Sequence, residues 1–193
     1  MFNRLVLAAA LAFAAVTPVY AQTAPAAATA PDSVTVSMAE QAITNLGLID
    51  VMIHGFDKGV REGSDFNDLT ADQKEGFIVV FHQHIDAERP ALIHKLALNV
   101  ATKVSREEMT NMLALSKIGY LKAVIMASAN DSTEPDPTMM SADEKAVFDR
   151  FSDADFVGRF LDGVDVNLIG DDMVRIGGEA YTAFEAGTKS GTT

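Results

Sequence analysis

Residues 70–85 read TADQKEGFIVVFHQHI, and this stretch decides the fold class. Its first four residues, Thr70 to Gln73, form a capping box, in which the threonine hydroxyl accepts the amide three residues on and the glutamine reaches back. The positions that follow at steps of three and four are Phe77, Val80, Phe81, His84 and Ile85. That period predicts an amphipathic α-helix with one buried face.

The same pattern extends over most of the chain. Three further capping boxes begin at Ser37, Ser105 and Ser141, and Pro90 suits the first turn of a new helix. The expected helices run from Ser37 to near Gly63, from Thr70 to near Glu88, from Pro90 to Val104, from Ser105 to near Ile125, from Ser141 to Phe151, through a short segment at 156–161, and from Val166 to Ala186. No alternating strand pattern is found, so the sequence predicts an all-α single helical bundle of five to seven helices with disordered termini.

Some positions qualify this pattern. Gly47, Gly55 and Gly59 interrupt the first helix and predict close packing or a kink. The segment 130–138 is rich in Asn, Asp, Ser and Pro and is the clearest internal loop. The segments at 70–87 and 141–151 resemble each other, which indicates either an internal duplication or convergence of capped helices on one composition.

The N-terminus has the three parts of a secretory signal peptide. Arg4 supplies positive charge, the 12 residues from Leu5 to Val16 are all apolar, and Val19-Tyr20-Ala21 provides a cleavage site. A membrane-spanning helix needs about 20 apolar residues. We therefore expect a signal peptide at 1–21 and export to the periplasm, with no transmembrane segment after cleavage. The expected division continues with a flexible Ala/Thr/Pro-rich linker at 22–33, an all-helical domain at 34–186 and a disordered tail at 187–193.

Charge and cysteine content narrow the function classes. The chain has 15 basic and 27 acidic residues, so its field repels nucleic acid and anionic lipid head groups. It contains no Cys, which excludes disulfides, thiol chemistry, thiolate metal sites and covalent haem attachment.

The centre of the chain carries a family-like pattern. Glu88-Arg89-Pro90-Ala91-Leu92-Ile93 opens one helix, the run 104–109 starts the next, and Gly119 follows about ten residues later. Over residues 86–127 this resembles the domain of unknown function 2059 family of exported bacterial proteins. Where that family has an aromatic pair and a proline, this chain has Leu115-Ser116-Lys117-Ile118. Residues 151–159 are more similar to that part of the family pattern. The resemblance implies an all-helical periplasmic domain and no established reaction.

The metal-site candidates are His82, His84 and Glu88, with Asp86 as a further donor. His82 and His84 point about 200° apart on a helix, so they do not ligate one metal together without help. His84 and Glu88 are four residues apart and share a face. Alternatively, His84 belongs to the buried stripe and the others are ordinary, partly exposed residues.

Enzyme motifs are missing. The chain has no Gly-x-Ser-x-Gly elbow, phosphate loop or dinucleotide fingerprint. A hydrolase with an unrecognised site would require residues such as His54, His84, Glu108 and Asp149 to converge in one cavity.

These observations favour an exported, non-catalytic helical domain without a cofactor. We expect it to bind another periplasmic or envelope protein, or a small apolar ligand in a groove between helices. A periplasmic metal-binding protein is the alternative, and the hydrolase is the third hypothesis.

Overall fold

A computed structural model of the chain describes residues 31–130 and 132–190. Within them all regular structure is helical, which confirms the all-α prediction. The α-helices are α2 (Ser33–Leu46), α3 (Leu48–Glu62), α4 (Ala71–Lys103), α5 (Arg106–Ser116), α6 (Gly119–Ala129), α7 (Ala142–Phe151), α8 (Asp155–Gly163) and α9 (Gly170–Ser190). Three short 3₁₀ helices join them: η1 (Ser64–Phe66), η2 (Pro137–Met139) and η3 (Val166–Ile169). The expected signal peptide at 1–21 and most of the expected linker lie outside the described residues.

Several helix boundaries differ from the prediction. The expected helix from Ser37 to Gly63 is split into α2 and α3 at Gly47, whose backbone is left-handed with φ 67°. The expected pair of helices around Pro90 is one continuous helix, α4. The helix expected from Ser105 is broken into α5 and α6 at Ile118, which takes an extended backbone and is buried.

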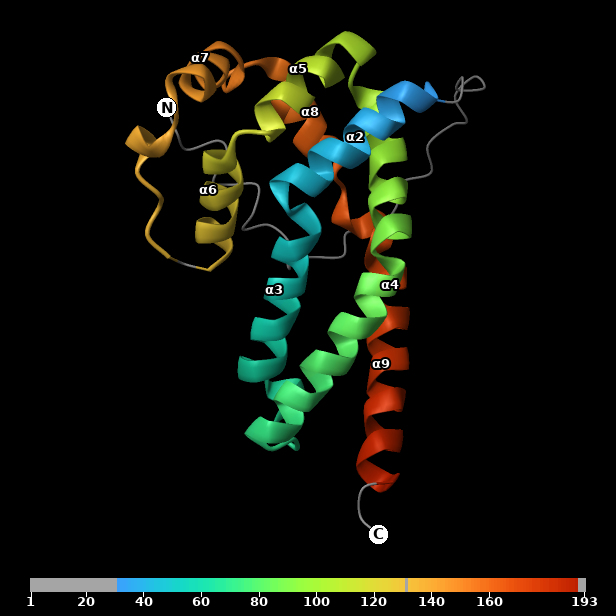
Figure 1. Cartoon of the computed structure of the whole chain (residues 1–193). Coiled ribbons are helices and arrows are strands. Elements are labelled where there is room, and N and C mark those ends of the chain that lie inside the picture. The colour runs from blue at the N-terminus through green and yellow to red at the C-terminus, as the bar shows by residue number, and fades with distance from the viewer. Residues whose placement is uncertain (1–30, 131, 191–193) are drawn as a thin grey trace.

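The continuity of α4 is decided by packing. Proline removes one helical hydrogen bond and usually bends or breaks a helix. On both sides of Pro90, however, α4 carries fully buried side chains, including Phe81, Ile85 and Leu96. Burial on both sides keeps the chain helical through the proline, and Figure 1 shows that α4 changes direction part-way along its length.

The remaining helices are arranged around α4. This 33-residue helix contacts α2, α3, α8, η3 and α9, while α5 packs against α2, α7 and α8. In Figure 1, α2, α5, α7 and α8 form a wide end, and α3, the first half of α4 and most of α9 form a narrow arm. The core is one contiguous cluster whose largest fully buried side chains include Phe81, Phe160, Ile43 and Leu96.

Three of the four predicted capping boxes are present, at Thr70/Gln73, Ser105/Glu108 and Ser141/Glu144. The capping box predicted at Ser37 is wrong, since α2 starts four residues earlier. The Asp32 carboxylate caps the helix there by accepting hydrogen bonds from the backbone amides of Val34 and Thr35. At the other end, α9 continues to Ser190, so the first four residues of the expected tail at 187–193 are helical.

No single helix of the described residues is both long and apolar enough to cross a bilayer, and α5 and α6 reach that composition only as a pair bent by 77°.

Gly47 gives a test of the α2–α3 corner. An added Cβ would meet Lys122 Cε at 2.9 Å and would sit on a left-handed backbone. Because that conformation costs an L-residue about 1–2 kcal/mol, Gly47→Ala should lower the free energy of unfolding by this amount. Gly59→Ala in the interior of α3, where nothing lies within 4 Å, should instead raise it by about 0.5–1 kcal/mol. Urea unfolding followed by circular dichroism measures both, and equal effects of the two variants would contradict the assigned corner.

Candidate functional site

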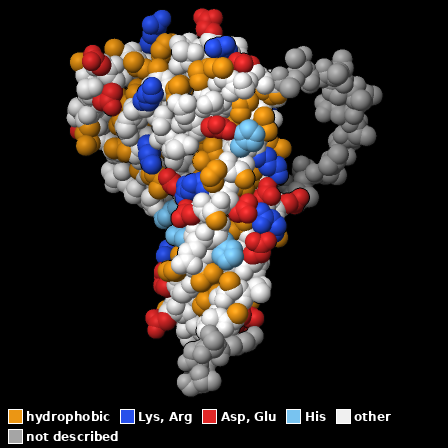
Figure 2. All heavy atoms as spheres, turned by 45° about the vertical axis from the view of Figure 1, so that its right-hand side comes forward, with side chains coloured by type: hydrophobic (Ala, Val, Ile, Leu, Met, Phe, Trp, Pro, Cys, Tyr) orange, Lys and Arg blue, Asp and Glu red, His pale blue; other side chains and the backbone are white. Residues whose placement is uncertain are grey.

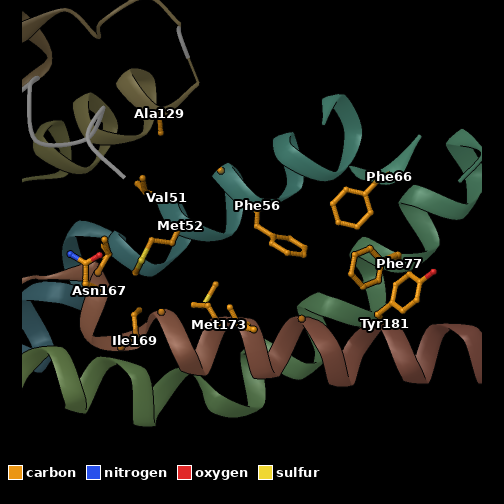
Figure 3. A pocket seen from close by; sticks show the side chains of 15 residues that line it. Val51, Met52, Phe56, Phe66, Phe77, Ala129, Asn167, Ile169, Met173 and Tyr181 are labelled. Atoms are coloured by element: carbon orange, nitrogen blue, oxygen red, sulfur yellow. The ribbon is translucent and has the colours of Figure 1, made fainter. Parts of the chain in front are cut away.

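An apolar groove with a volume of about 700 Å³ lies between α3 and α9. The structure places α3 along one wall, α9 along the other and α4 beneath them (Figure 3). Its lining residues are Val51, Met52, Gly55, Phe56, Phe66, Phe77, Ala129, Val166, Asn167, Ile169, Gly170, Met173, Val174, Gly177 and Tyr181. None of these side chains carries a charge, and only Asn167 and Tyr181 have a hydrogen-bonding group.

Helical spacing produces the two walls. Along α9 the lining positions are Gly170, Met173, Val174, Gly177 and Tyr181, which recur at steps of three and four and so share one face. The neighbouring face of α9, with Ile176 and Ala180, is fully buried. One helix therefore supplies both a core face and a groove face, and this places Met173 and the two glycines along the groove.

Aromatic rings close one end of the groove. The Phe77 ring meets Tyr181 edge-on at 5.6 Å between centroids and lies 5.7 Å from Phe66. The Phe56 ring lies 5.9 Å from Phe77 and stacks on Phe81 at 3.7 Å. Such ring pairs add to the stability gained from burial. They give this end of the groove a fixed apolar wall.

The opposite end carries one polar side chain, Asn167, among apolar ones. Figure 3 places Asn167 there, far from Phe66, Phe77 and Tyr181. The Asn167 side-chain amide donates to Asp165 Oδ1 at 2.8 Å, and its backbone N–H donates to the same oxygen at 3.0 Å. Asp165 is the N-cap of η3, so one carboxylate both starts the 3₁₀ turn and orients the amide.

The groove is open to solvent along α9. Val174 is 77% exposed and Tyr181 is 38% exposed, so two of the large side chains that line the groove are in contact with solvent. Figure 2 shows one face of the molecule. On that face, acidic, basic and apolar side chains are mixed along the narrow arm. The basic groups of α9 near the groove are paired, since Arg175 contacts Glu88 and Glu179.

The predicted metal candidates do not come together. His82 Nε2 lies 2.9 Å from a carboxylate oxygen of Asp57, whereas Glu88 pairs with Arg175 on α9. His84 is half-buried and so is not part of the fully buried stripe. In the described residues no three His, Cys, Asp or Glu side chains are grouped so that they could hold a metal ion.

The residues named for a hydrolase are also separate. The Ser105 backbone amide and hydroxyl donate hydrogen bonds to the Glu108 carboxylate and lower its pKa. Arg159 contacts the same carboxylate. Asp149 pairs with Lys145 on the surface of α7. Neither of these acids, nor His54 or His84, lines the groove.

Two features of this region escaped sequence analysis. One is the groove itself, since its walls are 100 or more residues apart in the chain. The other is Asp57, whose side chain is only 10% exposed and accepts from His82. The sequence did carry a signal for Asp57: this acid lies on the core-facing stripe of the predicted first helix, and a buried charge requires a partner.

Comparison with protein-family models, curated proteins and solved structures finds no match for this chain. The resemblance of residues 86–127 to the domain of unknown function 2059 family therefore stays a prediction.

The Asp57–His82 pair gives a second stability test. His82→Ala would leave a buried carboxylate without its donor, which typically costs about 1–3 kcal/mol. The side chain of His84 lies on the same helix and makes no hydrogen bond with the described residues. His84→Ala should therefore change the free energy of unfolding by less than about 0.5 kcal/mol. Urea unfolding at neutral pH compares the two variants. Equal losses would show that the pair contributes nothing specific.

Proposed function

We propose that this protein is a non-catalytic binding protein that holds a small apolar ligand in the α3–α9 groove. The observation that carries the proposal is an uncharged groove of about 700 Å³ flanked by exposed Val174 and Tyr181. Ligand pockets typically measure roughly 300–1,000 Å³ and are lined mainly by apolar and aromatic side chains. The groove has both properties.

The expected affinity follows from burial. A ligand that buries about 300 Å² of apolar surface gains roughly 7 kcal/mol at about 25 cal/mol per Å². A gain of this size corresponds to a dissociation constant of about 10 μM before the costs of association, so the measured constant should be weaker than that. The aromatic wall at Phe66, Phe77 and Tyr181 is already packed, so little ordering is needed on binding.

The lining also supports binding over catalysis. General acid–base or nucleophilic chemistry needs a titratable or nucleophilic side chain in reach of the ligand. Apart from the Tyr181 phenol, the lining residues offer no such group. We therefore assign the groove no reaction. The metal-binding alternative gains no support, because no three His, Cys, Asp or Glu side chains of the described residues are grouped so that they could hold a metal ion.

A groove-filling substitution tests the proposal. Beyond the adjoining residues and backbone of α9 itself, nothing lies within 4 Å of a Cβ built at Gly177 or at its exposed neighbour Gly178, but only Gly177 lines the groove. Gly177→Leu should weaken binding of the neutral fluorophore Nile red at least about tenfold, because the new side chain occupies ligand space. Gly178→Leu should leave binding within about twofold. Both variants replace a helical glycine and should be equally or more stable than the parent.

Fluorescence titration of the purified protein measures this difference, with circular dichroism as the check on folding. Nile red binding that Gly177→Leu leaves intact, or no binding by the parent protein, would overturn the groove as the ligand site.

We further propose that the protein acts after export, in the periplasm. The support is the signal-like composition of residues 1–21, with Arg4, the apolar run to Val16 and the small residue Ala21. Expression of the full sequence in a Gram-negative host should give a periplasmic product whose N-terminus is Gln22. Mass spectrometry of the periplasmic fraction measures the cleavage site, and a cytoplasmic product that retains Met1 would contradict export.

A further inference from the structure

We propose that the ligand of the groove is a single-chain lipid, whose unbranched alkyl tail lies lengthwise between α3 and α9 with its methyl end at the aromatic wall. This inference rests on the proposed function and adds a ligand class to it. The length of the groove, the lack of hydrogen-bonding groups along that length and the volume of the groove each favour this class.

The groove face of α9 sets the length. Tyr181 stands eleven residues after Gly170 on this helix, so at about 1.5 Å per residue the face is roughly 16 Å long. An extended alkyl chain, with C–C bonds of about 1.5 Å, advances roughly 1.25 Å per carbon, so about 13 carbons span the same distance. Figure 3 shows α3 facing α9 over this length, with Asn167 at one end and Tyr181 at the other. A ligand that follows the groove is therefore elongated.

The middle of the groove offers no partner to a polar ligand. Among the described residues that line it, only Asn167 and Tyr181, at its two ends, have a hydrogen-bonding side-chain group. The residues between them, such as Met52, Met173 and Val174, lie on α3 and α9, whose backbone groups bond within each helix. A polar group placed against these walls loses water and gains no hydrogen bond. Peptides, sugars and nucleotides carry such groups along their whole length, whereas an alkyl chain carries neither polar groups nor charge and so matches the uncharged lining.

The volume of the groove suits one such chain. A methylene group is about as large as a water molecule, whose share of the liquid is about 30 Å³, so 13 carbons occupy roughly 400 Å³. The groove has about 700 Å³, which leaves room for a head group. Two chains of this length need roughly 800 Å³ before any head group is added. A single-chain lipid therefore fits better than a two-chain lipid.

The two ends of the groove orient the chain. The buried Phe77 ring is in contact with Phe66 and Tyr181, so this end is closed by rings that are already packed. The Asn167 side chain is exposed, and beyond its bond to Asp165 it retains one N–H donor and the amide oxygen. A polar head therefore finds solvent and hydrogen-bonding groups at the Asn167 end, and the methyl end meets the rings.

A chain-length series tests the length. The octyl, decyl, dodecyl, tetradecyl and hexadecyl dimethylamine oxides share one head group that is uncharged at pH 8. Calorimetric titration below each micellar concentration measures their binding to the purified protein. Full burial of one methylene strengthens binding about fourfold, and the groove is open on one side, so each two-carbon step up to dodecyl should strengthen it about fourfold. The step from tetradecyl to hexadecyl should change the affinity less than about twofold, because the added carbons lie beyond the wall.

A branched isomer separates length from apolar area. The 2-butyloctyl dimethylamine oxide has as many carbons as the dodecyl compound, but its main chain is that of the octyl compound. It should bind at least about fourfold more weakly than the dodecyl compound, because its branch does not lie along the groove. Equal binding of the two isomers would overturn the proposal, since affinity would then follow apolar area alone.

Gly177→Leu tests the direction of the chain. Gly177 stands seven residues after Gly170, which is roughly 10 Å or about eight carbons along the groove from the Asn167 end. A leucine there should leave octyl binding within about twofold and remove the gain from longer chains, so dodecyl should bind at least about tenfold more weakly than to the parent. The matched control Gly178→Leu, which does not line the groove, should leave the whole series unchanged.

The outcomes separate the two proposals. If affinity rises by equal steps through hexadecyl, or if Gly177→Leu weakens all five compounds alike, the lengthwise alkyl chain is overturned. The groove still stands as a ligand site in that case if Nile red binds the parent and Gly177→Leu blocks it. If neither Nile red nor any alkyl compound binds, both proposals fail.

Discussion

Burial of α4 is the interaction on which the rest of the structure depends. Its side chains Phe81, Ile85, Leu96 and Val100 are fully buried, and helices from both ends of the described chain pack on them. Each such side chain removed from water contributes roughly 1.5–3 kcal/mol. The arrangement in Figure 1 follows, because α2, α3, α8 and α9 all pack on the same central helix.

The groove is a consequence of this arrangement. Both α3 and α9 bury one face on α4, and across the groove they stand apart (Figure 3). Gly55, Gly170 and Gly177 present no side chain toward the space between them. Larger residues at these positions would fill the groove, so the same glycines that weaken the helices keep it open. The two walls of the groove are therefore held apart by packing on α4 and not by contact with each other.

Charge is distributed so that the groove stays neutral while its surroundings are acidic. Ion pairs such as Arg89–Asp50 and Arg61–Glu75 tie α3 to α4 outside the groove. Exposed pairs of this kind contribute little to stability. Their effect near the groove is to leave few basic groups unpaired.

The sequence by itself determined the helical class, three of the helix starts and much of the core. A capping box such as Thr70–Gln73 involves residues three apart, and an apolar period is a property of one helix, so both are local. The local prediction failed at Pro90, because the burial of side chains on both sides of this residue outweighed the tendency of proline to end a helix. Only the tertiary structure decided the groove, the Asp57–His82 pair and the separation of His84 from Glu108. These depend on segments distant in the chain, such as α3 and α9, and on the direction in which each helix leaves α4. No local pattern encodes that direction.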